Sequence, residues 1–304
     1  MFKKIVVVDN TGMNDWAKAR LSSLSEQAFF YDDFPTDPEV VKARIGDADC
    51  LMVSYCTPIT RDIIEASKNL RYIGMCCSLY NERSSNVDVI CARERGITVT
   101  GIFDYGDGGV IEFGVSALVW LLHGFGGKQW RARPNELYCQ KIGVLGLGTT
   151  GFKLAKALQF LDADIYYSDL AQKPEADAMG MKFLPLNELL ETVDIITTQL
   201  PKNSCLIGEA EFNRFGSGKI LLNTSIGPTF SVPALKKWLE DKSNFYICEE
   251  VGVGDTYEEL KGFENFMYID SCAGSSEQCT QRLSQKSIAN VEAFLASDST
   301  VQQK

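Results

Sequence analysis

Three glycines spaced as G-x-G-x-x-G, Gly146, Gly148 and Gly151, are the residues of this sequence best suited to bind a ligand. The first permits a tight turn, the second lets backbone amides approach a pyrophosphate, and the third allows the following helix to pack closely. The unpaired amides at the start of that helix favour a phosphate. Asp169, 18 residues after Gly151, is spaced to accept hydrogen bonds from a ribose 2′-hydroxyl. The pattern predicts a dinucleotide site.

The residues around the glycines have the order of strand, turn, helix and strand that this motif requires. Residues 142–145 are apolar, residues 154–161 repeat apolar side chains at helical spacing, and residues 165–167 form a second strand. No cation follows Asp169 before Lys173, so the carboxylate is expected to repel a 2′-phosphate. We therefore expect NAD(H) as cofactor and partner, in preference to NADP. The alternative is a glycine turn in an α/β protein that binds no dinucleotide.

Composition narrows the remaining classes of function. The 304 residues suffice for two domains, and 45% hydrophobic with 23% charged residues is typical of a globular protein. A net charge of −10 without a basic stripe argues against nucleic acid and anionic membranes as partners. The first ten residues become polar too quickly for a signal peptide, and no apolar run reaches membrane-spanning length. We expect a cytoplasmic protein.

The sequence offers ten cysteines but a single histidine. No cysteines form a C-x-x-C pair and most lie in apolar runs, so we expect reduced core residues, with no disulfides and no metal site. His123 ends an apolar helix just before Gly124, where an imidazole favours the helix C-terminus, so we assign it a structural role. Cys272 and the vicinal pair Cys76 and Cys77 are weak candidates for chemistry, because a reactive thiol needs nearby cations.

Strand and helix periods alternate along the chain, which predicts an α/β fold with two doubly wound parallel-sheet domains. The first series of predicted strands lies at residues 4–8, 28–31, 50–56, 71–77 and 97–100. The second lies at residues 141–146, 164–168, 181–184, 193–199, 219–224, 244–248 and 266–269. Between them, residues 110–123 form a helix that is apolar nearly all round, which we expect to be buried between domains or in a subunit interface. Residues 86–95 form a helix that Gly96 closes, and residues 275–295 form a terminal amphipathic helix.

This order of motifs resembles the D-isomer-specific 2-hydroxyacid dehydrogenase family over most of the chain. The similar segments are residues 86–100, 110–122, 141–151, 193–201 and 219–227. The resemblance implies a Rossmann nucleotide-binding domain, residues 103–275, inserted in a flavodoxin-like substrate domain, residues 1–102 plus 276–304. It also implies a homodimer. The cofactor-binding residues that it implies are Gly146, Gly148, Thr149, Thr150, Gly151, Asp169, Leu200, Pro201 and Thr224.

The sequence departs from this family at the residues that carry its chemistry. The family's arginine, which binds the substrate carboxylate, corresponds to Ile226, and its acid–base histidine corresponds to Ser271. Isoleucine cannot form the bidentate pair of a guanidinium with a carboxylate. General acid–base transfer typically contributes about 10²–10⁴-fold to a rate, so the missing histidine matters as well. The loop at residues 76–85 is longer than the family's glycine-rich turn, and it contains Arg83.

Three functions therefore stay open. The first is an NAD-dependent oxidoreductase that acts on a small 2-hydroxy or 2-oxo acid or on an altered substrate. In it, Arg83 binds the small anionic substrate and Glu249 or Glu250 moves the proton, with Asp255 and Lys202 as further candidates. The second is a sensor that binds NAD(H) without turning over a substrate. The third is a structural or partner protein in which even cofactor binding is lost.

Overall fold

The chain divides into two compact units, which are described separately. The computed structural model describes residues 1–82, 85–202 and 204–301, with side chains up to residue 297. One unit contains Met1–Gly106 and Ser275–Lys304, and the other contains Asp107–Gly274. The chain therefore passes between the units twice, after residue 106 and after residue 274. None of the described helices is long and apolar enough to cross a membrane.

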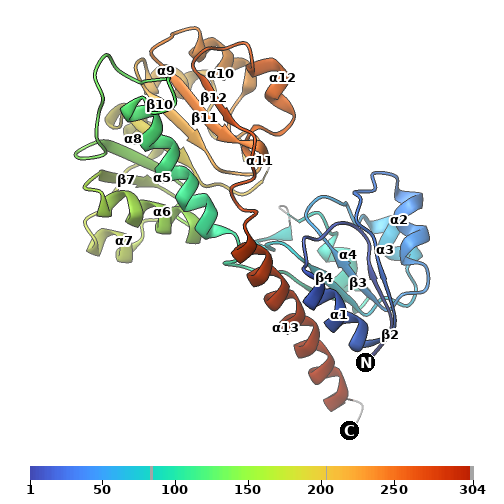
Figure 1. The fold of residues 1–304 in the computed structure, drawn as a ribbon. Coiled ribbons are helices and arrows are strands. Elements are labelled where there is room, and N and C mark those ends of the chain that lie inside the picture. The colour runs from blue at the N-terminus through green and yellow to red at the C-terminus, as the bar shows by residue number, and fades with distance from the viewer. Residues whose placement is uncertain (83–84, 203, 302–304) are drawn as a thin grey trace. The chain divides into compact units, whose positions relative to one another are not determined.

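The first unit is built on a five-stranded parallel sheet (Figure 1). Its strands are β1 (Phe2–Val7), β2 (Ser25–Phe30), β3 (Cys50–Val53), β4 (Tyr72–Met75) and β5 (Thr98–Thr100). Their order, β2-β1-β3-β4-β5, is the flavodoxin-like one. The helices of this unit are α1 (Asp15–Ser23), α2 (Pro38–Ile45), α3 (Arg61–Ala66), α4 (Val89–Glu94) and α13 (Glu277–Val301).

Helices cover both faces of this sheet. Leu51 of β3 belongs to the core cluster of α2, α3 and α4, whereas the adjacent Cys50 belongs to the cluster of α1 and α13. Successive side chains of a strand point to opposite faces, which explains how one strand supplies both clusters. α13 also forms an ion pair with α1, at 2.6 Å between Arg20 Nη2 and Glu292 Oε1. The last helix of the chain thus completes the first unit.

The second unit is built on a seven-stranded parallel sheet in the order β12-β11-β10-β9-β6-β7-β8. Its strands are β6 (Lys141–Leu145), β7 (Asp164–Ser168), β8 (Lys182–Phe183), β9 (Ile195–Thr198), β10 (Ile220–Asn223), β11 (Phe245–Glu249) and β12 (Phe266–Ile269). Its helices are α5 (Asp107–His123), α6 (Thr149–Phe160), α7 (Pro174–Ala178), α8 (Leu186–Thr192), α9 (Glu209–Phe215), α10 (Val232–Leu239), α11 (Glu250–Val253) and α12 (Tyr257–Leu260). The strand order reverses between β6 and β9, the switch point at which doubly wound sheets bind their ligands.

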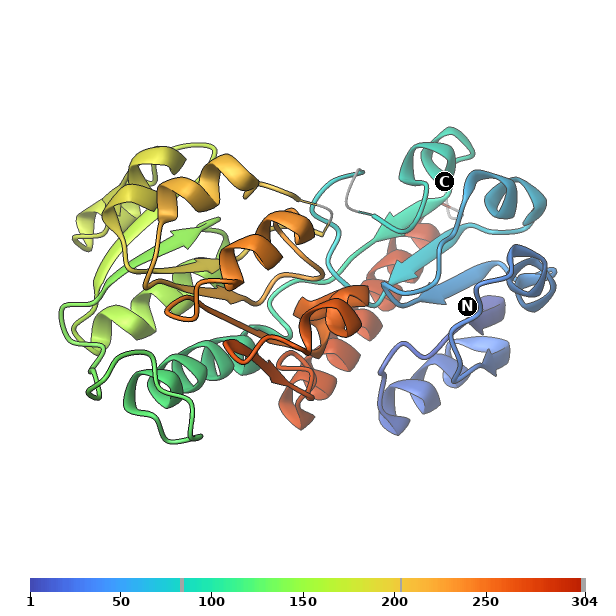
Figure 2. The same cartoon turned by 90° about the horizontal axis from the view of Figure 1, so that it is seen from above.

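Helices lie on both faces of this second sheet, as Figure 2 shows. α5, α6 and α7 share one core cluster with Ile195 of β9, and α8, α9 and α10 share the other with the adjacent Ile196. The predicted fold class is therefore confirmed: both units are α/β with parallel, doubly wound sheets. Each predicted strand has a counterpart, although several boundaries differ by a few residues.

Two predicted helices can be compared with the structure in detail. The helix expected from residue 86 begins only at Val89, because the backbone of residues 86–88 pairs with Ile59 and the Asp88 side chain caps the helix by accepting from the Cys91 amide at 2.8 Å. The apolar helix α5 is not buried all round in the single chain. One stripe, including Leu118, packs into the core of the second unit, whereas Trp120 remains 52% exposed.

Candidate nucleotide-binding site

The glycine loop connects β6 to α6 at the carboxyl edge of the sheet. Gly146 adopts φ +87°, the left-handed region that favours glycine, and a Cβ there would lie 2.5 Å from the carbonyl oxygen of Gln199. A Cβ on Gly151 would lie 2.1 Å from the carbonyl oxygen of Gly146. Backbone therefore occupies the space beside both glycines, which explains why neither position can carry a side chain without a shift of the loop.

Gly148 has the opposite surroundings. A Cβ at this position would meet no atom within 4 Å, and its φ of −73° is open to any residue. Gly148 is the N-cap of α6 and provides no side-chain cap, so the amides of the first turn have no intrahelical acceptor. Open space beside an uncapped helix N-terminus fits a pyrophosphate, and the exposed Thr149 and the half-buried Thr150 begin that helix.

Asp169 follows β7 and contacts the glycine loop. Its Oδ2 accepts a hydrogen bond from the Leu147 amide at 2.9 Å, and its Oδ1 accepts one from the Leu170 amide at 2.6 Å. The ammonium of Lys173 lies 3.4 Å from Oδ2. The carboxylate is therefore already paired with the first cation that follows it in the sequence. The spacing of four residues between Asp169 and Lys173 was the signal in the sequence for this ion pair.

A second charged contact holds the first turn of α6. Asp107, the first residue of α5, accepts hydrogen bonds from the Thr150 hydroxyl and the Lys153 ammonium, both at 2.8 Å. Asp107 is separated by more than forty residues from both partners. No local sequence pattern could have revealed this contact, because the packing of α5 against α6 creates it.

Polar side chains also fix the loops that follow β9 and β10. The side-chain amide of Gln199 donates to the hydroxyl of Thr224. The backbone amide of Leu200 donates to the hydroxyl of Ser225 at 2.8 Å. Asn223, at the end of β10, accepts from the Ser225 amide at 3.0 Å. Leu200 and Thr224 thus lie at the same carboxyl edge as the glycine loop, and the exposed Pro201 follows directly. Sequence analysis did not identify Asn223 or Ser225.

Glu249 ends β11 as a buried carboxylate, only 3% exposed. Its Oε1 accepts from the Gly252 amide at 3.0 Å, and its Oε2 accepts from the Ala273 amide at 3.1 Å. Burial raises the pKa of Glu249 above its ordinary value, although these backbone hydrogen bonds act in the opposite direction. The carboxylate caps α11 and anchors residue 273. Glu250 and Asp255 are both exposed.

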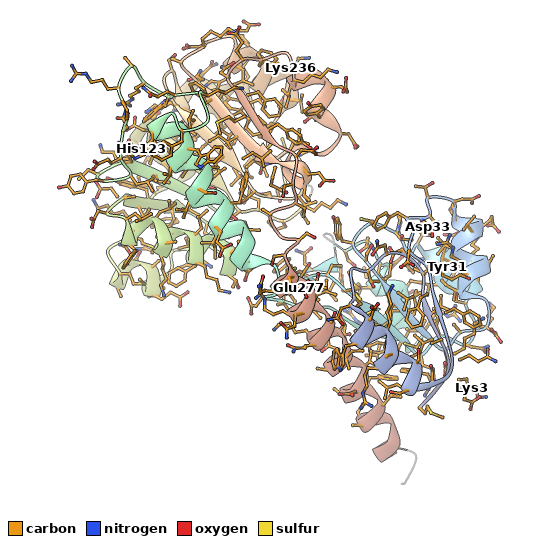
Figure 3. All side chains as sticks on the ribbon, in the orientation of Figure 1. Lys3, Tyr31, Asp33, His123, Lys236 and Glu277 are labelled. Carbon is orange, nitrogen blue, oxygen red and sulfur yellow. The ribbon has the colours of Figure 1, made fainter. Side chains whose placement is uncertain are left out.

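The other sequence candidates are placed as follows. His123 lies at the end of α5 (Figure 3), where its ring stacks on Phe125 with the ring centroids 4.9 Å apart. Cys76 and Cys77 are buried, and burial raises the pKa of the Cys76 thiol to about 12. Cys272 is half-buried. The prediction that the cysteines are core residues is wrong for three exposed ones, Cys56, Cys139 and Cys205.

Comparison with known proteins identifies the family. Residues 120–249 match the model for the NAD-binding domain of the D-isomer specific 2-hydroxyacid dehydrogenases. A hydroxypyruvate reductase of Blautia hydrogenotrophica is 28% identical over 96% of this chain and 97% of its own length. A putative 2-hydroxyacid dehydrogenase of Staphylococcus haemolyticus is 32% identical over 68% of this chain and 69% of its own length. The chain belongs to the D-isomer specific 2-hydroxyacid dehydrogenase family.

A solved structure shares the fold of this chain. The 2-hydroxyacid dehydrogenase of Ketogulonicigenium vulgare superposes with a TM-score of 0.80 at 23% identity, covering 98% of this chain and 96% of its own. Ile226 and Ser271 stand at the positions that the sequence comparison assigned to the family's arginine and histidine. Ile226 follows β10 and is 39% exposed, and the exposed Ser271 follows β12. Arg83 lies outside the described residues, and Lys202 is exposed. Among the described residues, no group of three or more histidine, cysteine or acidic residues is placed to hold a metal ion.

Proposed function

We propose that this chain is an oxidoreductase that transfers a hydride between NAD(H) and the carbon of a small 2-hydroxy or 2-oxo acid, or of an altered substrate with the same reacting group. The observation that carries the proposal is the glycine loop. Its outer glycines are surrounded by backbone, whereas the space beside Gly148 is open in front of an uncapped helix. That combination fits a bound pyrophosphate. Bound there, the nicotinamide coenzyme supplies the hydride chemistry.

NAD(H) is the proposed form of the cofactor. Asp169 retains acceptor capacity for a ribose hydroxyl and carries a charge that disfavours a 2′-phosphate. The remaining proposed contacts are those of Gly146, Thr149, Thr150, Gly151, Leu200, Pro201 and Thr224. Of these, Leu200 and Thr224 are held by the hydrogen bonds that link the loops after β9 and β10.

The substrate class rests on the relatives, since they are named as hydroxypyruvate reductase and 2-hydroxyacid dehydrogenase. Reduction of a keto carbon requires a cation for the carboxylate and a donor of a proton. Ile226 has no cationic group for the substrate carboxylate, and Ser271 has no imidazole to donate the proton. We therefore assign binding of the substrate carboxylate to Arg83 and proton transfer to Glu250 or Glu249. Asp255 and Lys202 are further candidates for proton transfer. As in the family resemblance, the proposed assembly is a homodimer.

A second candidate function is binding of NAD(H) without turnover. The observation that favours it is Glu249, because both oxygens of this carboxylate are held by backbone amides rather than directed at a reacting group. The lost arginine and histidine positions point the same way. A third candidate, a partner protein that binds no cofactor, requires that the glycine loop be a structural relic.

Calorimetric titration with NADH and NADPH is the first test. NADH is expected to bind in the micromolar range. NADPH is expected to bind more weakly, because only NADPH has a 2′-phosphate, which would lie beside the negative charge of Asp169. A panel of 2-oxo acids then separates the first two functions, because turnover supports the oxidoreductase and tight binding without turnover supports the sensor. If neither nucleotide binds, both proposals fail and the partner protein takes their place.

Arg83→Ala is expected to abolish turnover of 2-oxo acids, a loss of about 100-fold or more in kcat/KM, because a charge-assisted contact to the substrate is removed. NADH affinity is expected to stay unchanged. Arg93→Ala is the matched control, since Arg93 is an exposed arginine that pairs with Glu82 at 3.0 Å. Equal turnover in the two variants would show that Arg83 does not bind the substrate.

A further inference from the structure

A cation lies beside the carboxylate that the proposed function assigns to the cofactor ribose. The Lys173 ammonium is 3.4 Å from Asp169 Oδ2, and the side chains are 32% and 18% exposed. Both residues are accessible to a ligand and close enough to act on the same group. The inference below rests on the proposed binding of a nicotinamide dinucleotide at the glycine loop.

The backbone of Lys173 is fixed to the same strand that carries Asp169. The hydroxyl of Tyr167, a residue of β7 that is fully buried, accepts a hydrogen bond from the Lys173 amide at 2.8 Å. The same hydroxyl donates to Asp177 Oδ1, also at 2.8 Å. These two contacts fold the segment after Asp169 back onto β7. The fold therefore fixes the backbone of Lys173 at a position from which its ammonium reaches Asp169.

Asp169 has little acceptor capacity left. An ionised carboxylate offers about four lone-pair sites. The amides of Leu147 and Leu170 each take one, and the ammonium of Lys173 lies against a third. One ribose hydroxyl can be accommodated without displacing the lysine. A phosphate brought to the same place would meet an anion and a cation together, rather than an anion alone.

We infer that Lys173 is a specificity-determining residue that offsets the charge of Asp169 and lets the pocket accept a ribose 2′-phosphate. The preference for NADH over NADPH is then smaller than Asp169 alone would impose. The lysine reaches a 2′-phosphate as a direct cationic partner, whereas a 2′-hydroxyl needs only the free site on the carboxylate. Asp169 thus makes the site prefer NADH to NADPH, and Lys173 reduces the difference between the two affinities.

Equilibrium titrations of wild type and Lys173→Met with NADH and NADPH test this assignment. We expect Lys173→Met to weaken NADPH binding by about tenfold or more, as the loss of a charge-assisted contact implies, and to change NADH binding by less than about twofold. AMP and adenosine 2′,5′-bisphosphate repeat the comparison with probes that differ by the single phosphate. Lys173→Arg is the matched control, because it retains the cation and is expected to keep the wild-type ratio of affinities.

The outcomes separate this inference from the function on which it rests. Unchanged NADH binding by Lys173→Met also shows that the variant is folded. If Lys173→Met leaves the ratio of NADPH to NADH affinities as in wild type, the lysine does not set the preference, although the dinucleotide site stands. If wild type binds none of the four nucleotides, the proposed function and this inference both fail. A difference between wild type and Lys173→Met that shrinks at high ionic strength supports the electrostatic origin.

Discussion

Gly148→Ala is expected to weaken NADH binding by about tenfold or more, or about 1.4 kcal/mol, without changing the melting temperature. The two effects separate because a Cβ at this position meets no protein atom within 4 Å and the backbone is in an extended conformation that alanine adopts. The added methyl group enters only the space where the pyrophosphate is proposed to approach the amides of α6. Calorimetric titration with NADH and thermal unfolding measure the two quantities.

Two other glycines serve as controls for this variant. Gly262 also has no atom within 4 Å of a Cβ, and it lies in a turn after α12, so Gly262→Ala is expected to change neither quantity. Gly151→Ala is expected to lower stability by about 1–3 kcal/mol, because its Cβ would lie 2.1 Å from the Gly146 carbonyl oxygen. Wild-type NADH affinity in Gly148→Ala would place the cofactor elsewhere and contradict the proposed site.

The sequence was sufficient to predict the parts of this site that depend on local backbone geometry. The glycine motif requires a turn, a close approach and a helix start within six residues, so its spacing alone indicates all three. The strands followed from runs of apolar residues, because both faces of a parallel sheet are buried. These features do not depend on which distant residues pack against them.

The parts that sequence analysis missed depend on contacts between distant segments. Asp107 meets Thr150 and Lys153 only because α5 packs on α6. The hydroxyl of Tyr167 accepts a hydrogen bond from the Lys173 amide, and this contact brings Lys173 back beside Asp169. In both cases the residue types were visible, but their pairing was a consequence of the tertiary structure.

Glu249 is the residue for which sequence and structure suggest the most different roles. The sequence offered it as an acid–base group, whereas the structure directs both oxygens to the amides of Gly252 and Ala273. Glu249→Ala is expected to lower the free energy of unfolding by about 2–4 kcal/mol, because a helix cap is lost and two amides lose their acceptor. Glu250→Ala, at the exposed neighbouring position, is expected to change it by less than about 0.5 kcal/mol. Denaturant unfolding measures both.

The pH dependence of stability gives an independent check on Glu249. Burial raises the pKa of this carboxyl in the folded state, so the unfolded chain releases the proton first as the pH rises. Between the ordinary pKa and the raised one, the folded state holds more protons, and its stability falls with increasing pH. Glu249→Gln cannot titrate there. Wild type is therefore expected to lose stability relative to this variant as the pH rises above about 4.5, and to lose no more once the raised pKa is passed.

Comparison of stability with turnover in the Glu249 variants decides between its two roles. A capping carboxylate predicts that Glu249→Gln is less stable than wild type, because the new amide group faces one backbone N–H without an acceptor. Any activity would then fall with the folded fraction and recover where the variant is fully folded. A proton-transfer role predicts wild-type stability with turnover reduced by about 10²-fold or more. Since the carboxylate accepts from the Ala273 amide, the capping role also fixes the last residues of the second unit, which ends at Gly274.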